Sequence, residues 1–196
     1  MNEIINNILT RRSIRVFKEE QIPESDLNVI LEAATFAPTG MNAQSWHFTA
    51  IHSKEKLAQF NSLVQKVLVK HPGEDPSMPY IDFLKKVAEA PNFNFFYHAP
   101  TLVIASNSIS SASAAPQSDC TAALQNIFLA AHSLGIGSCW IHLLVLISDL
   151  PEIRDYLTEL GVPPEHRIYG SAALGFPGRS TPKPAPRKAG TITIVK

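Results

Sequence analysis

The chain has 196 residues, which suits one domain with a sizeable hydrophobic core. Its 17 basic side chains balance its 17 acidic ones, so the domain-wide positive field of a nucleic-acid-binding protein is missing. No apolar run reaches the roughly 18 residues of a membrane-spanning helix, and the N-terminus lacks the basic and apolar regions of a secretion signal. The two cysteines, Cys120 and Cys139, fit a reduced compartment, so we expect a cytoplasmic protein without a disulfide framework.

The first half of the chain is predicted to contain mainly helices. Apolar spacing and turn residues predict helices over 2–10, 23–37, 54–70 and 80–90, and a strand over 46–52. The segment 38–44 between helix and strand is rich in turn residues. The region 70–98 has the least regular pattern and many aromatics, and fits a substrate-facing lid and an irregular core segment equally well.

The second half alternates strands and helices. We expect strands over 101–105, 138–142, 167–175 and 191–195, and helices over 118–134 and 151–160. The loop over 106–116 is rich in serine and alanine and is expected to be mobile. The helix over 118–134 carries many small residues on its apolar face, which suits either a central helix or a dimer seam.

These elements predict a single α+β domain over 1–196, a sandwich in which a small mixed sheet is flanked by helices. There are too few parallel units for a doubly wound sheet. From residue 179 the chain becomes proline-rich and basic, so 179–196 is expected to form an extended arm. Its terminal strand over 191–195 would pair with a distant sheet edge, such as that of another subunit.

The most distinctive local feature is a basic cluster in Arg11-Arg12-Ser13-Ile14-Arg15. Three of the seven arginines of the chain fall within these five residues. Guanidinium groups suit bidentate recognition of phosphate, and the Ser13 hydroxyl adds a donor. The cluster by itself fits both a site for one phosphate group and a solvated basic turn after a short helix.

The motifs that are missing narrow the chemistry. The sequence has no G-x-G-x-x-G, Walker A or H-E-x-x-H motif, and its histidines show no metal-ligand spacing, so no metal site is predicted. In a strand, Cys139 and His142 would point to opposite faces, which argues against a thiol–imidazole pair. With no strong protein nucleophile or base, a redox cofactor that brings its own chemistry is favoured.

Four motifs in order resemble the nitroreductase family of FMN-dependent oxidoreductases. They are the arginine cluster with Phe17, the stretch Ala37-Pro38-Thr39-Gly40-Met41-Asn42-Ala43-Gln44-Ser45-Trp46, the stretch Gly135-Ile136-Gly137-Ser138-Cys139-Trp140-Ile141, and Leu174-Gly175-Phe176-Pro177. The proline-rich tail with Arg187 follows them. The resemblance therefore spans essentially the whole chain.

The resemblance implies a nitroreductase-like homodimer with one FMN at each of two interface sites and no protein side chain as the catalytic group. Arg11, Ser13 and Arg15, with Arg12 close by, match positions that hold the flavin phosphate and polar edge, and Arg187 matches a tail arginine that reaches the phosphate. Further matches belong to the partner loop (Pro38, Thr39, Gly40, Asn42, Gln44) and to the strand end beside the ring (Trp140, Ile141, His142, Leu143). The amide side chains of the loop also suit a uracil-like ring edge.

The implied activity is a ping-pong cycle in which NADH or NADPH gives hydride to flavin N5 and a small acceptor, such as a nitroaromatic or a quinone, takes the electrons. Two departures qualify it: Ser45 replaces a usual proline, and His142-Leu143-Leu144 stands where many relatives have glycines. His142 could tune the flavin or face away from it. The alternatives are dehalogenation or flavin fragmentation on the same scaffold, and a non-catalytic flavin-binding protein.

Overall fold

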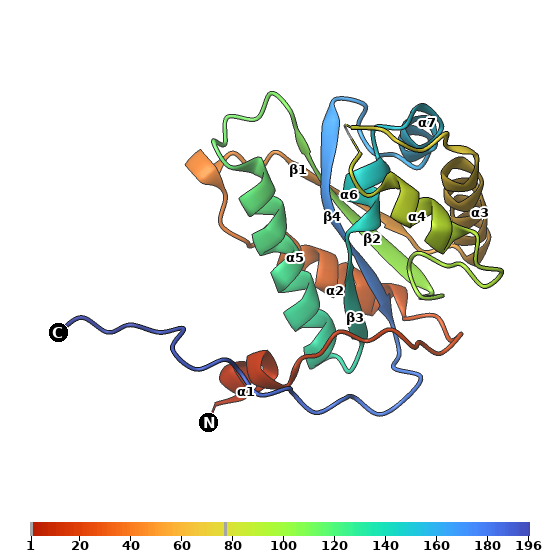
Figure 1. Cartoon of the computed structure of the whole chain (residues 1–196). Coiled ribbons are helices and arrows are strands. Elements are labelled where there is room, and N and C mark those ends of the chain that lie inside the picture. Colours follow the sequence, from red (N-terminus) through yellow and green to blue (C-terminus); the bar gives the residue numbers. More distant parts are fainter. Residues whose placement is uncertain (1, 77) are drawn as a thin grey trace.

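The computed structural model describes residues 2–76 and 78–196. Within them the chain forms an α+β fold (Figure 1). Its helices are α1 (Glu3–Thr10), α2 (Glu24–Thr35), the 3₁₀ turn η1 (Gly40–Asn42), α3 (Lys54–Lys70), α4 (Ile81–Ala88), α5 (Pro116–Ser133), α6 (Leu143–Ile147) and α7 (Pro151–Glu159). Its strands are β1 (Trp46–Ile51), β2 (Thr101–Ser108), β3 (Gly137–Ile141) and β4 (His166–Gly175).

The four strands form one sheet in the order β1-β2-β4-β3. All three strand pairs are antiparallel, so the prediction of a mixed sheet is wrong for the named strands. Parallel pairing occurs in the isolated bridge between Ser13 and Ser138, which covers the outer edge of β3. The arginine cluster is thereby attached to the sheet edge.

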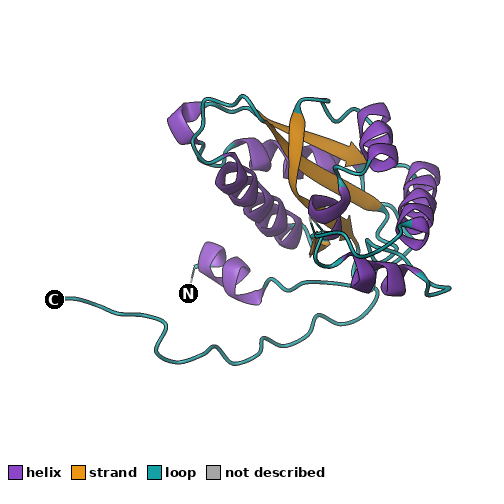
Figure 2. Cartoon of the chain, turned by 45° about the horizontal axis from the view of Figure 1, so that its top comes forward, coloured by secondary structure: helices purple, strands orange, loops and turns teal. Residues whose placement is uncertain are grey.

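Helices cover both faces of this sheet (Figure 2). On one face, α2 and α5 pack with one side of β2 and β4 around Val103, Leu124 and Ile127. On the other face, α3, α4, α6 and α7 enclose a second core that includes Phe60, Phe96 and Leu144. The predicted strand over 46–52 is β1, and its residues Trp46, Phe48 and Ala50 all pack against the α2–α5 side.

Two of the helices begin with a side-chain cap. The side chain of Asn2 accepts a hydrogen bond from the Ile5 N–H of α1 at 2.9 Å, and Ser53 accepts one from Lys56 of α3 at 3.3 Å. Such caps satisfy backbone donors that would otherwise lack partners. Pro116 lies in the first turn of α5, where its missing N–H costs nothing.

The helix α1 leaves its apolar side uncovered in the single chain. Ile4 is 71% exposed, and Ile5, Ile8 and Leu9 are also exposed. The helix touches α5 through the Asn7 side chain, which donates to the Leu129 carbonyl at 2.9 Å. A row of exposed isoleucines on a short helix is typical of a surface that another chain covers.

Several predicted elements differ from those observed. The strand over 191–195 is not formed in the single chain, where residues 179–196 are exposed, lack helix and strand, and extend away from the domain (Figure 1). A lone strand needs a partner edge to satisfy its backbone. The stretch after β3 is the short helix α6, which the pattern did not predict. The helix predicted to reach residue 134 ends at Ser133, and Leu134, its C-cap, is 38% exposed.

The two irregular regions are better defined than their sequences suggest. In the region 70–98, Phe95 and Phe96 are buried and Phe95 packs edge-on against Phe60, with ring centroids 5.3 Å apart, so the aromatic end is a core segment. In the serine-rich loop, the hydroxyls of Ser45 and Ser111 lie 2.5 Å apart, and Ser111 accepts the Ser113 N–H at 3.0 Å. These bonds tie the expected mobile loop to the start of β1.

Candidate functional site

The arginine cluster lies along β3. The Ile14 N–H donates to the Ser138 carbonyl at 2.9 Å, next to the Ser13–Ser138 bridge. The approach is close enough that a Cβ on Gly137 would lie 2.9 Å from the Ile14 side chain. A glycine is therefore required for the segment to dock, and docking places Arg11, Arg12 and Arg15 beside the strand that the sequence analysis assigned to the flavin ring.

Arg11, Arg12 and His132 share a small cavity of about 110 Å³, whose wall continues over Gly135–Ser138, Pro177 and Thr181. Burial lowers the pKa of Arg11, and the charges of Arg12 and of Arg187 in the tail act in the same direction. Burial, Arg11 and Arg12 likewise lower the pKa of His132. Positive charge is thus concentrated at one point of a chain with no net charge.

No carboxylate neutralises this cluster. Among residues 2–76 and 78–196, none of Arg11, Arg12, Arg15 and Arg187 forms an ion pair with an acidic side chain. The Ser138 hydroxyl beside the cavity is buried and lacks a hydrogen-bond partner. Uncompensated guanidiniums next to a buried free hydroxyl favour an anion site over a solvated basic turn.

Arg12 has a different orientation from its neighbours. Its guanidinium donates to the main-chain carbonyls of Arg11 and Leu9, the latter at 2.7 Å, at the C-terminal end of α1. Its Nε is buried without a partner. Arg12 therefore stabilises the end of α1, where a positive charge is favourable. It also adds its charge to the wall of the cavity.

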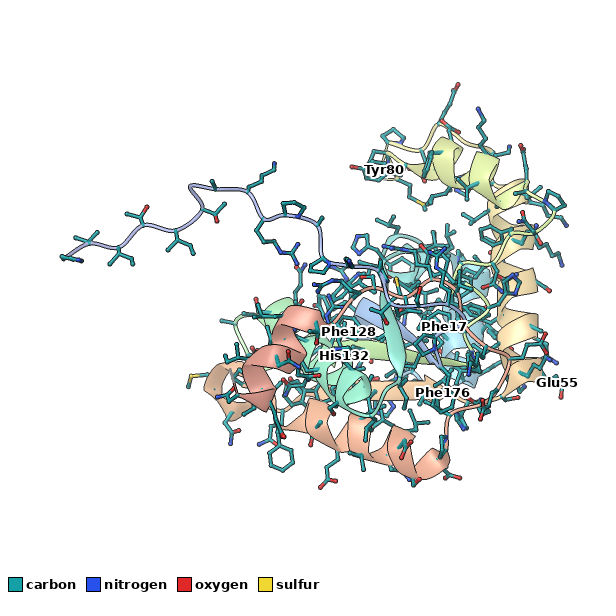
Figure 3. All side chains as sticks on the ribbon, turned by 90° about the horizontal axis from the view of Figure 1, so that it is seen from below. Phe17, Glu55, Tyr80, Phe128, His132 and Phe176 are labelled. Atoms are coloured by element: carbon teal, nitrogen blue, oxygen red, sulfur yellow. The ribbon has the colours of Figure 1, made fainter. Side chains whose placement is uncertain are left out.

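The other two arginines rest on aromatic rings. The Arg11 guanidinium lies 5.8 Å from the centroid of the Phe128 ring on α5, and the Arg15 guanidinium lies 5.8 Å from that of Tyr97. Figure 3 shows Phe128 and His132 together on the part of α5 that faces α1. Cation–π contacts of this kind hold a guanidinium in place without neutralising it.

The predicted partner loop is rigid and strained. Met41, Asn42 and Gln44 all have positive φ, at 56°, 52° and 45°. The Gln44 side chain donates to the Asn42 side chain at 2.8 Å, and the Gln44 N–H donates to the Thr39 hydroxyl at 3.3 Å. Left-handed non-glycine residues cluster where the surrounding structure determines the loop conformation, often at ligand sites.

In the single chain this loop lies far from the arginine cluster. The Gly40 N–H donates to Asp119 in the first turn of α5, whereas His132 in the last turn contacts Thr10 of α1 at 2.9 Å. At a rise of about 1.5 Å per residue, the helix separates these two points by about 20 Å. Figure 1 shows η1 and α1 at opposite ends of α5. One chain therefore brings together the arginines and β3, but not the loop.

At the end of β3, the side chains pack mainly within the protein. The Trp140 ring packs edge-on against Phe128 at 6.2 Å between centroids, and Ile141 is buried. His142 is exposed and directly precedes α6, so it does not continue the strand, and the argument that Cys139 and His142 point to opposite strand faces does not apply. Cys139 is buried, and the two side chains form no hydrogen bond in the described part of the chain. Leu143 is half-buried.

Sequence reasoning missed four side chains that build the site: Tyr97, Asp119, Phe128 and His132. Asp119 and His132 were expected only as parts of a helix, and no local pattern sets them apart. Within the described residues, no group of three histidine, cysteine or acidic side chains could hold a metal ion. A search of the same residues finds no helix that could cross a membrane.

The chain belongs to the nitroreductase family, whose sequence model matches residues 8–176. An FMN-bound nitroreductase of Bacteroides fragilis is 43% identical and superposes with a TM-score of 0.90 over 100% of both chains. A protein of Archaeoglobus fulgidus, provisionally named an NADH dehydrogenase/NAD(P)H nitroreductase, is 31% identical over 90% of this chain and 87% of its own. An iodotyrosine deiodinase of Thermotoga neapolitana is 26% identical over 88% of each chain.

Proposed function

We propose that this protein is an FMN-dependent oxidoreductase that takes hydride from NADH or NADPH and reduces a small acceptor such as a nitroaromatic or a quinone. The observation that carries the proposal is the arginine cluster beside β3, which has no carboxylate partner in the described chain. The FMN bound by the Bacteroides fragilis relative and the names of the family members support the cofactor and the donor.

The residues fit the phosphate end of FMN. Arg11 and Arg187 would hold the phosphate, since the charge of Arg187 lowers the pKa of Arg11 and neither arginine forms an ion pair among the described residues. Ser13 would add a hydroxyl donor, and the unpartnered Ser138 hydroxyl lies at the same strand edge. Arg15, fixed over Tyr97, would face the polar edge of the ring system. Arg12 would contribute charge, because its donors already serve the end of α1.

The site is completed by a second copy of the chain in this proposal. The loop with Pro38, Thr39, Gly40, Asn42 and Gln44 lies at the far end of α5, so it would serve the flavin of the partner subunit. The uncovered isoleucines of α1 and the extended arm over 179–196 supply surfaces for such a dimer. Sedimentation of the purified protein would test this, with twice the mass of a single chain expected.

When bound, FMN would supply the redox chemistry by accepting hydride at N5 and passing electrons to the acceptor. The backbone of Trp140, Ile141, His142 and Leu143 would lie beside the ring, with an N–H available near its reactive nitrogen. The arginines would stabilise negative charge on the reduced cofactor. His142, exposed before α6, stands where its imidazole could border the acceptor space.

Reductive dehalogenation is the second candidate, because the Thermotoga neapolitana relative is named an iodotyrosine deiodinase. Steady-state oxidation of NADH and of NADPH by the FMN-loaded protein should be compared with menadione, nitrofurazone and 3-iodotyrosine as acceptors. Turnover with menadione or nitrofurazone supports the reductase. Iodide release in their place would favour dehalogenation, and binding of FMN without turnover of any acceptor would leave only a flavin-binding role.

A further inference from the structure

The first turn of α5 contains a buried carboxylate that the proposed chemistry does not use. Asp119 is 5% exposed, and its Oδ1 accepts the Gly40 N–H at 3.1 Å. Its other oxygen is buried and lacks a hydrogen-bond partner in the described chain. Burying a carboxylate with one oxygen unbonded costs free energy, so the hydrogen bond from Gly40 matters for the stability of this region.

The donor to Asp119 is Gly40, and only glycine fits at this position. A Cβ on Gly40 would lie 2.5 Å from the Ser113 hydroxyl and 3.3 Å from the Ser113 Cβ. Ser113 is itself fixed, because it is buried and its hydroxyl accepts the Ala115 N–H at 3.1 Å just before α5. Gly40 is therefore held between Asp119 and Ser113.

The strained residues follow directly after this clamped glycine. Met41 and Asn42 have positive φ, and Gln44 adopts the same region two residues later. A non-glycine residue in this region carries a conformational cost, and it persists only where the surrounding structure offsets that cost. The Asp119–Gly40 bond ties the start of this turn to α5, an 18-residue helix whose inner face is buried.

We propose that Asp119 is a positioning residue that fixes the loop 38–44 in the conformation in which it meets the flavin ring. The inference rests on the proposed function, since it assigns the loop to the ring. Asp119 touches neither cofactor nor acceptor; it acts through the Gly40 N–H. Its loss would therefore disturb the surroundings of the ring and the fit of the acceptor, while the phosphate anchor at Arg11, about 20 Å away along α5, stays intact.

The test compares Asp119→Ala with Asp119→Asn, which keeps an oxygen at the accepting position. We expect the Gly40 amide of Asp119→Ala to exchange its proton about tenfold faster, since a hydrogen bond to a charged group is lost. The visible circular dichroism of bound FMN should change and the KM for menadione should rise about fivefold or more, while the Kd for FMN changes by less than about threefold. Asp119→Asn should restore most of these properties.

Gly40→Ala provides a second route to the same loop without altering α5, and so covers the case in which Asp119→Ala fails to fold. It should reproduce the change in dichroism and KM, and Ser113→Ala in the same chain should relieve it in part. Unchanged dichroism and KM in folded Asp119→Ala and Gly40→Ala would overturn the proposal. If the wild-type protein binds no FMN, the proposed function fails and the positioning role falls with it, whatever the Gly40 amide shows.

Discussion

Asp119 and His132 stand at opposite ends of α5, and each is bonded to a different half of the proposed flavin site. Asp119 accepts from Gly40 of the strained loop, and His132 contacts Thr10 beside the arginine cluster. One straight helix thus sets the distance between the two halves. Because the helix holds the loop and the arginine cluster about 20 Å apart, we expect each complete site to use two chains.

Replacing Arg11 by alanine should weaken FMN binding more than it changes turnover of the protein that retains FMN. A charge-assisted hydrogen bond is worth about 1.5–3 kcal/mol, so the Kd for FMN should rise roughly 10- to 100-fold. Arg187→Ala should act in the same direction. Flavin fluorescence titration measures both, with Arg167→Ala, an exposed arginine on β4, as the matched control. Full FMN occupancy in both variants would contradict the anion-site assignment.

Binding of FMN should raise the pKa of His132. Burial, Arg11 and Arg12 lower this pKa in the free protein, and a phosphate among the arginines would offset their charge. Protonation and binding then favour each other, so FMN should bind more tightly as the pH falls through the pKa of His132. NMR titration of the imidazole with and without FMN measures the shift.

His166 is the control for that titration. Burial lowers the pKa of His166, and the charge of Glu165 opposes this shift. His166 begins β4, whereas the arginine cluster lies near the other end of that strand. Its titration should not respond to FMN. A His132 pKa that stays constant on binding would place the phosphate elsewhere.

Both thiols should be inert in the folded protein. Burial raises the pKa of Cys120 to about 12, and burial also raises the pKa of Cys139 despite the neighbouring Arg15 and Arg11. At pH 8 neither residue forms much thiolate, the reactive species. Ellman's reagent should therefore find no accessible thiol in native protein and two after denaturation. Because the folded protein holds these protons more tightly than the unfolded chain, stability should fall as the pH rises above about 9.

A methyl group at Gly170 should destabilise the fold by crowding the core between α5 and β3. A Cβ there would lie 2.7 Å from both the Leu124 side chain and the Trp140 ring. Overpacking of this kind costs about 1–3 kcal/mol. Urea unfolding of Gly170→Ala measures the loss, and Gly135→Ala, where no atom lies within 4 Å of the added Cβ but φ is +73°, separates crowding from backbone strain. Equal stability of Gly170→Ala and the wild type would show that Trp140 can move aside.

The sequence was sufficient for the parts of the fold whose pattern is local. The strands β1 and β4 and the helix α3 were predicted within a residue or two, because α3 buries one regular face and the two strands are apolar stretches bounded by turn residues. The helix α6 was missed because its five residues are apolar throughout and carry no period. The strand over 191–195 was predicted from residue type, but a strand forms only when its backbone pairs with a neighbour, and in the single chain this segment extends away from the sheet.

The sequence indicated three motifs of the proposed site, but not how the fold arranges them in space. Arg11–Arg15 and β3 do come together, through the Ser13–Ser138 bridge. The sequence did not indicate that the Arg12 guanidinium donates to main-chain carbonyls at the end of α1. Asp119 and His132 could not be recognised, since their importance comes from the two ends of one helix meeting segments distant in sequence.

The most direct test of the central claim is the visible absorption spectrum of the purified protein reconstituted with FMN, recorded anaerobically before and after adding NADH and then NADPH. We expect the visible absorption of the bound oxidised flavin to bleach with at least one nucleotide and to return when menadione is added. A protein that binds no FMN, or whose flavin neither nucleotide reduces, would contradict it.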